Sequence, residues 1–274
     1  MAKVKTFKTI FPAVSVPLNA DYSINEPEFR AYLRWIKSFY GKGIEGLVCN
    51  GHTGEITGLT RAERKRVVEI CSEVCGDVMT IISGVNCENT AESIEMAKEA
   101  KEAGADGILL MPPHMWLRFG MNPNAPFEYI KDVAEGADVD IIIHLYPATS
   151  KAFYPVETLI KMCKEIDHVK CIKMGTRVTS IYEHDVRLLR QECPDISLIT
   201  CHDETLCVSW FPGMDGALIG FAGCVPELIC PAWDVFKNPD KHTLKEAQDW
   251  SNRIYHISRL STAEVSPPAR PMPA

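Results

Sequence analysis

Short apolar segments alternate with longer amphipathic segments along most of the chain. Eight of the apolar segments have the length and composition of buried strands: residues 10–16, 46–49, 78–82, 107–111, 139–145, 169–174, 196–200 and 217–221. The intervening segments carry helix signals, such as Thr60 and Glu63, which have the spacing of a capping box ahead of the apolar Val67 and Val68. Strands that alternate with helices in this way indicate βαβ units and a parallel sheet.

Eight such units within about 220 residues predict an α/β fold, namely a (β/α)8 TIM barrel over residues 1–225. A doubly wound sheet usually has fewer strands and a glycine-rich phosphate-binding turn, which this chain lacks. Further helices are expected at residues 227–236 and 244–260. We therefore predict a C-terminal helical extension over residues 226–274, with an unpacked proline-rich tail at 266–274.

Composition narrows the range of partners. The chain has 29 basic and 36 acidic residues and a formal net charge of -7, which disfavours nucleic acid and anionic membranes. No apolar run is long enough to span a bilayer, and the first ten residues lack the apolar core of a signal peptide. The 11 cysteines form no C-x-x-C pair and are expected to be reduced and mostly buried. These features predict a cytoplasmic protein that acts on small molecules.

Strict alternation within the sixth apolar segment separates its side chains into two faces. Ile172 and Met174 are predicted to face the helices, whereas Val169, Cys171 and Lys173 are predicted to face the barrel interior. In barrels of this kind the active site lies at the C-terminal ends of the strands. Lys173 is thus expected inside the barrel close to the catalytic end.

A lysine in that position suits nucleophilic catalysis. Removal from water lowers the pKa of an amine, and the neutral amine can form a Schiff base with a carbonyl substrate. The alternative is that Lys173 pairs with a buried carboxylate such as Asp203 or Asp215, and the residues alone leave the two interpretations equally weighted. Lys170, near the start of the segment, is expected to be solvated.

The fifth apolar segment places Tyr146 beside Lys173 at the same end of the barrel. A phenol there can exchange protons with a carbonyl or hydroxyl oxygen, as Schiff-base formation and aldol cleavage require. The alternative is a core tyrosine with a satisfied hydroxyl. His144 lies one layer lower, and for it we favour a hydrogen-bonded core histidine.

After the second segment, Gly51, His52 and Thr53 form a turn whose backbone N–H groups can hold a carboxylate, although an ordinary strand-to-helix turn is the alternative.

In this order the motifs resemble those of the dihydrodipicolinate synthase and N-acetylneuraminate lyase family of class I aldolases. The resemblance covers residues 11–226 and joins several motifs: the G-[ST]-T-G-E turn at 51–55, G-x-x-x-x-x-T-x-E-x-I at 84–94, A-x-x-A-G-A-D-G at 100–107, the tyrosine at Tyr146, I-K at Ile172-Lys173, and G-x-x-G-x-I/L at 213–218.

The resemblance implies a barrel with C-terminal helices, assembled as a homotetramer, that needs no metal or nucleotide cofactor. Lys173 would condense with the 2-oxo group of pyruvate, and Tyr146 would shuttle protons. His52 and Thr53 would hold the substrate carboxylate. Gly51 and Leu218 belong to matching motifs and are expected in the substrate site.

This sequence also departs from the family pattern. His52 stands where a hydroxyl residue is common, Met115 where the synthase has a tyrosine lent between subunits, and Lys151 where an arginine holds a second carboxylate. Proline follows Tyr146 directly. The chain also ends sooner after the eighth strand than is usual, so we expect a different C-terminal region. These departures argue against a role in lysine biosynthesis.

The run Met115-Trp116-Leu117 is similar to the M-W-L of trans-o-hydroxybenzylidenepyruvate hydratase-aldolases, which act on aromatic 2-oxo acids. Methionine and tryptophan would give the site an apolar wall, so Met115 and Trp116 are expected to contact an aromatic or apolar aldehyde. The alternative is that Trp116 packs at a subunit contact.

The sequence therefore predicts a class I aldolase or hydratase-aldolase that makes or breaks a carbon–carbon bond to pyruvate. Two alternatives remain: a 2-keto-3-deoxy sugar acid aldolase or dehydratase of the same family, and a non-catalytic barrel that binds a 2-oxo acid. His52 is further expected to give the rate profile a limb near pH 6.5.

Overall fold

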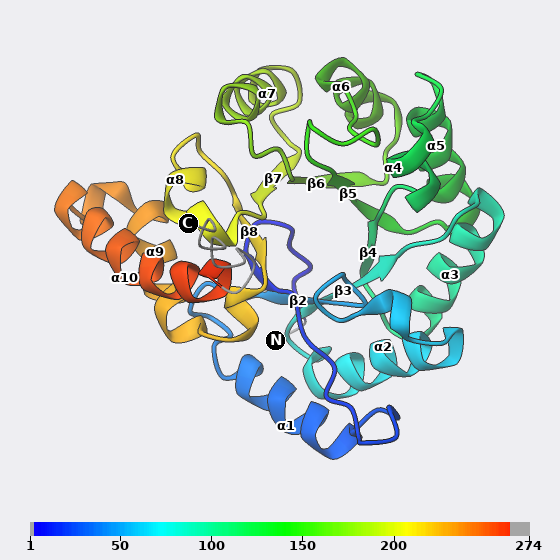
Figure 1. The fold of residues 1–274 in the computed structure, drawn as a ribbon, viewed down its shortest axis with the longest axis horizontal. Helices are drawn as coiled ribbons and strands as arrows, with labels where there is room; N and C mark the ends of the chain where they lie inside the picture. The colour runs from blue at the N-terminus through cyan, green and yellow to red at the C-terminus, as the bar shows by residue number, and fades with distance from the viewer. Residues whose placement is uncertain (1–2, 264–274) are drawn as a thin grey trace, which may run out of the picture.

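The computed structural model describes residues 3–263 and shows a ring of strands surrounded by helices (Figure 1). The eight strands are β1 (Ile10–Pro12), β2 (Gly46–Cys49), β3 (Thr80–Val85), β4 (Gly107–Leu110), β5 (Asp140–Leu145), β6 (Val169–Met174), β7 (Ser197–Thr200) and β8 (Gly216–Ile219). Every strand pairs in parallel with its neighbours, β1 pairs with β8, and a parallel bridge from Ala13 to Val48 closes the ring. The predicted (β/α)8 barrel is confirmed.

Helices follow the strands in the expected alternation. They are α1 (Glu26–Lys37), α2 (Arg61–Cys75), α3 (Thr90–Glu102), α4 (His114–Phe119), α5 (Ala125–Ala137), α6 (Val156–Glu165), α7 (Thr179–Glu192), α8 (Leu206–Trp210), α9 (Pro226–Lys237) and α10 (Leu244–Ala263). The predicted capping box opens α2: the Thr60 hydroxyl accepts from the Glu63 N–H, and the Glu63 carboxylate accepts from the Thr60 N–H at 2.8 Å.

The C-terminal helices lie outside the ring of strands, where α10 packs against α8 and α9 (Figure 1). Residues 227–236 and 244–260 are helical as predicted. The division of the chain at residue 225 stays a prediction. The proline-rich tail at 266–274 lies outside the described residues.

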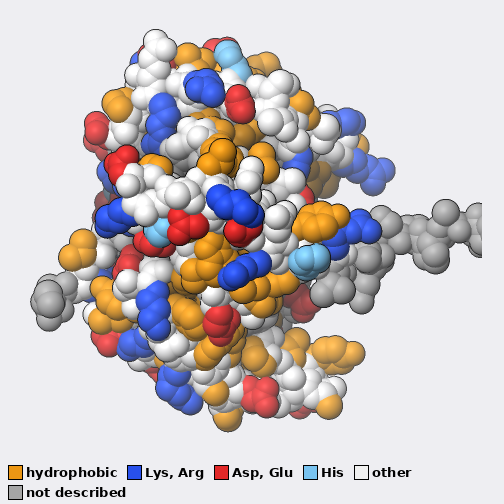
Figure 2. All heavy atoms as spheres, turned by 90° about the vertical axis from the view of Figure 1, so that its left-hand side faces the viewer, with side chains coloured by type: hydrophobic (Ala, Val, Ile, Leu, Met, Phe, Trp, Pro, Cys, Tyr) orange, Lys and Arg blue, Asp and Glu red, His pale blue; other side chains and the backbone are white. Residues whose placement is uncertain are grey.

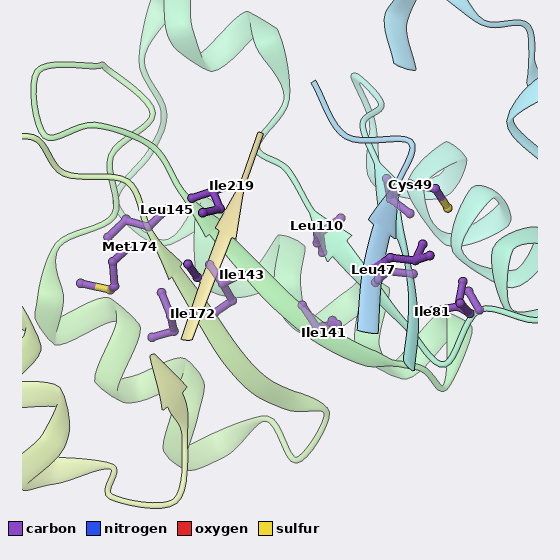
Figure 3. Packing of buried hydrophobic residues seen from close by; sticks show 14 of the residues in the cluster. Leu47, Cys49, Ile81, Leu110, Ile141, Ile143, Leu145, Ile172, Met174 and Ile219 are labelled. Atoms are coloured by element: carbon purple, nitrogen blue, oxygen red, sulfur yellow. The ribbon is translucent and has the colours of Figure 1, made fainter. Parts of the chain in front are cut away.

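Two apolar layers separate the inside of the ring from its outside. The strand side chains that face the helices include those labelled in Figure 3, among them Leu47, Ile81, Ile143 and Ile172. A smaller cluster fills the ring itself: Phe11, Ala13, Val48, Ile82, Leu109, Met111, Ile142, Cys171, Ile199 and Leu218. The interior of the ring is therefore a packed core. Any space for a ligand must lie beyond an end of the strands.

The start of β6 departs from strict alternation. Ile141 of β5 pairs with Val169, but the next residue, Ile142, pairs with Cys171, so Lys170 is an extra residue in the ladder. Val169 consequently packs in the helix-facing layer, and its predicted inward orientation is wrong. Lys170 is exposed, as expected.

The surface over the C-terminal helices carries both signs of charge. On the face shown in Figure 2, Lys and Arg side chains lie interspersed with Asp and Glu, and no broad basic patch forms there. Within residues 3–263, no helix is long and apolar enough to cross a membrane.

Candidate active site

A cavity of about 360 Å³ opens at the C-terminal ends of the strands. Its lining comes from five different strand ends: His52, His114, Leu117, His144, Tyr146, Pro147, Lys173, Arg177 and Cys201. His144 and Lys173 lie on β5 and β6, and Tyr146 follows β5 directly. The structure thus brings both predicted catalytic residues, Lys173 and Tyr146, into one cavity.

Lys173 makes its closest polar contact with a histidine. Its Nζ lies 3.2 Å from Nε2 of His144, and the two residues are register partners on adjacent strands. The carboxylates considered as alternative partners are engaged elsewhere: Asp203 accepts from the N–H groups of Gly220 and Phe221, and Asp215 pairs with Arg190 at 2.7 Å. Within residues 3–263, Lys173 forms no ion pair, so the buried salt-bridge alternative does not apply.

The surroundings of Lys173 favour its neutral amine. Burial lowers the pKa of the Lys173 ammonium; the Arg177 guanidinium reinforces the shift and Asp203 opposes it. A lysine with a lowered pKa has a larger fraction of free amine near neutral pH, which is the nucleophilic form.

Tyr146 contacts the turn that follows β2. Its hydroxyl lies 3.1 Å from Nε2 of His52. Burial raises the pKa of Tyr146 far above its usual value, so the phenol keeps its proton. Burial, together with the nearby Lys173 and His114, lowers the pKa of His52 to about 4. At neutral pH a protonated phenol and a neutral imidazole therefore lie within hydrogen-bond distance, and Tyr146 has a partner with which to exchange a proton.

The turn that carries His52 is held by the residues around it. Asn50, which precedes the turn, adopts a left-handed backbone conformation with φ of 52°, a region that asparagine tolerates better than most residues. Its side-chain amide donates to the Arg64 carbonyl at 2.9 Å and to the Ser83 hydroxyl at 3.1 Å. Gly84 lies so close to the Asn50 carbonyl oxygen that a Cβ would sit 1.8 Å from it. This packing fixes where the His52 ring enters the cavity.

Four other predicted site residues lie outside the cavity lining. Gly51 is buried within the turn, and Thr53 is exposed beside it. Leu218 packs in the apolar cluster inside the ring. Lys151 donates from Nζ to the Arg118 carbonyl at 2.9 Å, which ties the loop after β5 to the end of α4.

The short helix α4 presents only part of the M-W-L run to the cavity. Leu117 lines it, whereas Met115 is 52% exposed. Trp116 does not line the cavity and packs edge-on to Tyr129 and Tyr154, with ring centroids 5.6 and 6.3 Å away. The structure therefore does not bring Trp116 to the cavity, and the apolar wall from this helix is Leu117.

The family model for the dihydrodipicolinate synthetase family matches residues 6–267, nearly the whole chain. The chain belongs to this family. An uncharacterized DapA-like lyase of Pyrococcus horikoshii is 30% identical over 92% of this chain and 83% of its own length. A 4-hydroxy-tetrahydrodipicolinate synthase of Agrobacterium fabrum is 36% identical over 80% of this chain and 69% of its own length.

Solved structures of the family share the fold. YagE, a prophage protein of the dihydrodipicolinic acid synthase family from Escherichia coli K12, was solved in complex with pyruvate. It superposes with a TM-score of 0.84 at 20% identity, over 94% of this chain and 84% of its own. CdNal from Clostridium difficile, solved with mannosamine, gives 0.81 at 20% identity over 95% and 84% of the two chains. The predicted family membership is confirmed, and this family is one of carbon–carbon lyases.

Sequence reasoning missed several residues of this cavity. His144 was expected to be a core histidine, yet it contacts Lys173. The sequence motifs do not single out His114, Arg177 or Cys201, although each lies in a segment that directly follows a strand. That position was the available signal, because barrel sites are built from such segments. Within residues 3–263, no group of three or more His, Cys, Asp or Glu residues is arranged to hold a metal ion.

Proposed function

We propose that this protein is a Schiff-base-forming class I aldolase or hydratase-aldolase, in which Lys173 condenses with the 2-oxo group of pyruvate. The observation that carries the proposal is an inward lysine without an ion-pair partner among the described residues, facing a cavity that also contains a protonated phenol. The amine attacks the keto carbon, and Tyr146 supplies and recovers protons at the substrate oxygen. The substrate carboxylate is held at His52, by the backbone N–H groups of the turn that carries it.

The second substrate, in this proposal, is an aromatic or otherwise apolar aldehyde. Leu117 and Pro147 give the cavity an apolar side, and the rings of His52, His114 and His144 offer surfaces for stacking. Lys151 is bonded to a backbone carbonyl outside the cavity and is not placed to clamp a second carboxylate. On the side formed by Leu117 and Pro147, the hydroxyl groups of a sugar acid would find no side-chain hydrogen-bond partner.

Borohydride trapping tests the proposal. Incubation with pyruvate and borohydride should reduce the imine to a stable adduct, which mass spectrometry should locate on the peptide that contains Lys173. Lys173→Ala should abolish the adduct while the fold is kept, because the substitution removes a buried polar group that makes no ion pair among the described residues. Lys170→Ala, which removes the exposed lysine of the same strand, is the matched control and should label like the parent. Failure of pyruvate and other 2-oxo acids to label Lys173, or a label on Lys170, would mean that the barrel is a non-catalytic binder.

We further propose a cytoplasmic homotetramer, the assembly that the family resemblance implies. Sedimentation of the purified protein tests the assembly, and a monomeric species at micromolar concentration would contradict it.

A further inference from the structure

His144 and Lys173 lie in contact with each other in the wall of the cavity. Nε2 of His144 lies 3.2 Å from Nζ of Lys173, the atom that would form the imine. His144 is only 7% exposed. Its other ring nitrogen, Nδ1, is buried and has no hydrogen-bond partner among the described residues. The single polar contact of this imidazole is therefore the reacting amine.

The contacts of His144 leave its tautomer open. The tautomer of a histidine is usually set by the hydrogen bond that its other ring nitrogen makes, often to a carbonyl or carboxylate. Nothing fixes the tautomer of His144 in that way. The titratable and charged groups that face it are Lys173, His52, Tyr146 and Arg177, none of which is a carboxylate. Nε2 is thus free both to accept a proton and to release it.

We infer that His144 is a catalytic residue that carries a proton from the Lys173 nitrogen to the substrate oxygen during imine formation. The inference rests on the proposed function. When the amine lone pair forms the N–C bond, the nitrogen becomes positive and the electron pair of the C=O bond moves to oxygen. Nε2 of His144 takes one proton from the nitrogen and passes it to the oxygen bound to the same carbon. The product is the neutral carbinolamine, and His144 ends neutral as it began.

The electrostatics of the cavity suit this transfer. Burial, Lys173, His52 and Arg177 all lower the pKa of His144 far below its usual value. The imidazole is consequently neutral at working pH, with an available lone pair, and its protonated form is unstable and gives the proton up quickly. Tyr146, whose pKa burial raises, keeps its proton for the later loss of the hydroxyl as water.

The rate of trapping tests the inference. The probe is pyruvate with cyanoborohydride, and the measured quantities are the maximal rate of adduct formation and the pyruvate concentration at half-maximal rate. His144→Gln keeps an amide group near the position of Nε2 but cannot carry a proton. We expect the maximal rate to fall by about 10²-fold or more, with the half-saturating pyruvate concentration little changed and the same final adduct on Lys173.

The matched control is His202→Gln. His202 is also a buried histidine at this end of the barrel, but it does not line the cavity, so its variant should trap at the parental rate. A parental rate in His144→Gln, or a raised half-saturation with an unchanged maximal rate, would overturn the role of His144 while leaving the imine mechanism intact. Absence of trapping in the parent would instead overturn the proposed function. If His144→Gln fails to fold by circular dichroism, His144→Asn replaces it, with the same expected loss of rate and the same contradicting outcomes.

Discussion

Three imidazoles and one amine share a single cavity, and their proximity decides which of them carry protons. His52 lies with its ring centroid 5.4 Å from that of His144 and 6.3 Å from that of His114, and the electrostatic effect of Lys173 reaches both His52 and His144. A proton on Lys173 opposes protonation of His52 and His144, and burial lowers the pKa of both imidazoles. These two residues are therefore neutral bases, as imine chemistry at neutral pH requires.

This crowding changes what is expected of His52. The sequence alone predicts a limb of the rate profile near pH 6.5, but burial, Lys173 and His114 lower the pKa of His52 to about 4. The active form is the neutral imidazole that is hydrogen-bonded to Tyr146. Activity should therefore fall as the pH drops through about 4 and stay level from 5 to 7 on this account.

His52→Ala tests that expectation. The variant should show lower catalytic efficiency at pH 7 with a retained fold, and its profile should lack the acid limb near pH 4. Stopped assays of pyruvate release or consumption from pH 3.5 to 8 measure this. Parental efficiency and the same acid limb in the variant would contradict a role of His52 in proton transfer and would mean that the turn is purely structural.

The residue-level predictions succeeded where strand alternation is regular. They failed for Val169, which precedes the bulge, and where contacts across strands decide. Alternation placed Lys173 inward, because its strand neighbours Ile172 and Met174 suit the helix layer. The same rule predicts a core residue at His144, because the position of a residue along β5 does not reveal its partner on β6. The register between the two strands determines that partner, and no pattern within either strand encodes the register.

At the scale of elements, the extra residue in β6 is what aligns the catalytic pair. If β6 had no bulge and the ladder continued regularly from the Ile141–Val169 pair, His144 would lie opposite Ile172. The observed shift sets it opposite Lys173. Bulges commonly re-aim a side chain next to a site. The sequence offers no separate signal for this one, because Lys170 also fits the solvated start of a regular strand.

Helix α4 divides its side chains between the cavity and the core, and paired substitutions should separate the two roles. Leu117→Ala removes an apolar wall, so we expect KM for benzaldehyde to rise by about 10-fold while pyruvate trapping is unchanged. Trp116→Ala removes a ring packed on Tyr129 and Tyr154 and should instead lower the free energy of unfolding by about 2 kcal/mol.

Aldol assays with benzaldehyde and glyceraldehyde, together with urea unfolding, measure both effects. Each variant is the control for the other. A selective loss of benzaldehyde turnover in Trp116→Ala at unchanged stability would restore Trp116 to the substrate wall. An equal loss for both aldehydes in Leu117→Ala would favour the sugar acid alternative.

At the scale of the whole molecule, the number of strand-like segments is enough to predict the barrel. Eight apolar segments separated by helical ones leave few other arrangements for a parallel sheet, and short-range patterns suffice to count them. Strand ends were less well defined: the third segment was expected at 78–82, but β3 runs from Thr80 to Val85. The sequence Ile-Ser-Gly-Val within it does not alternate, because both faces of a barrel strand are buried.

The buried histidines should also make the whole fold sensitive to acid. The pKa of His202, which is 4% exposed, is lowered by burial and by Arg177 to about 4, and the pKa of His144 is lowered well below its usual value. In the unfolded chain both titrate near the usual value of about 6.5. Between pH 6.5 and 4 the unfolded state thus binds protons that the folded state does not. The contribution of these histidines to the free energy of unfolding is therefore largest above pH 6.5 and declines as the pH falls.

For His202 the loss at pH 5 should be on the order of 2 kcal/mol. Urea unfolding at pH 7.5 and pH 5.0 measures it, and His202→Gln should reduce the difference between the two pH values by about that amount. Contributions from carboxylates, including Asp203, whose pKa burial raises, are common to both proteins and cancel in the comparison. His256→Gln, which replaces an exposed histidine of α10, is the matched control for the substitution itself. If His202→Gln is as acid-sensitive as the parent, the fold does not hold this histidine neutral, and the acid sensitivity must arise elsewhere.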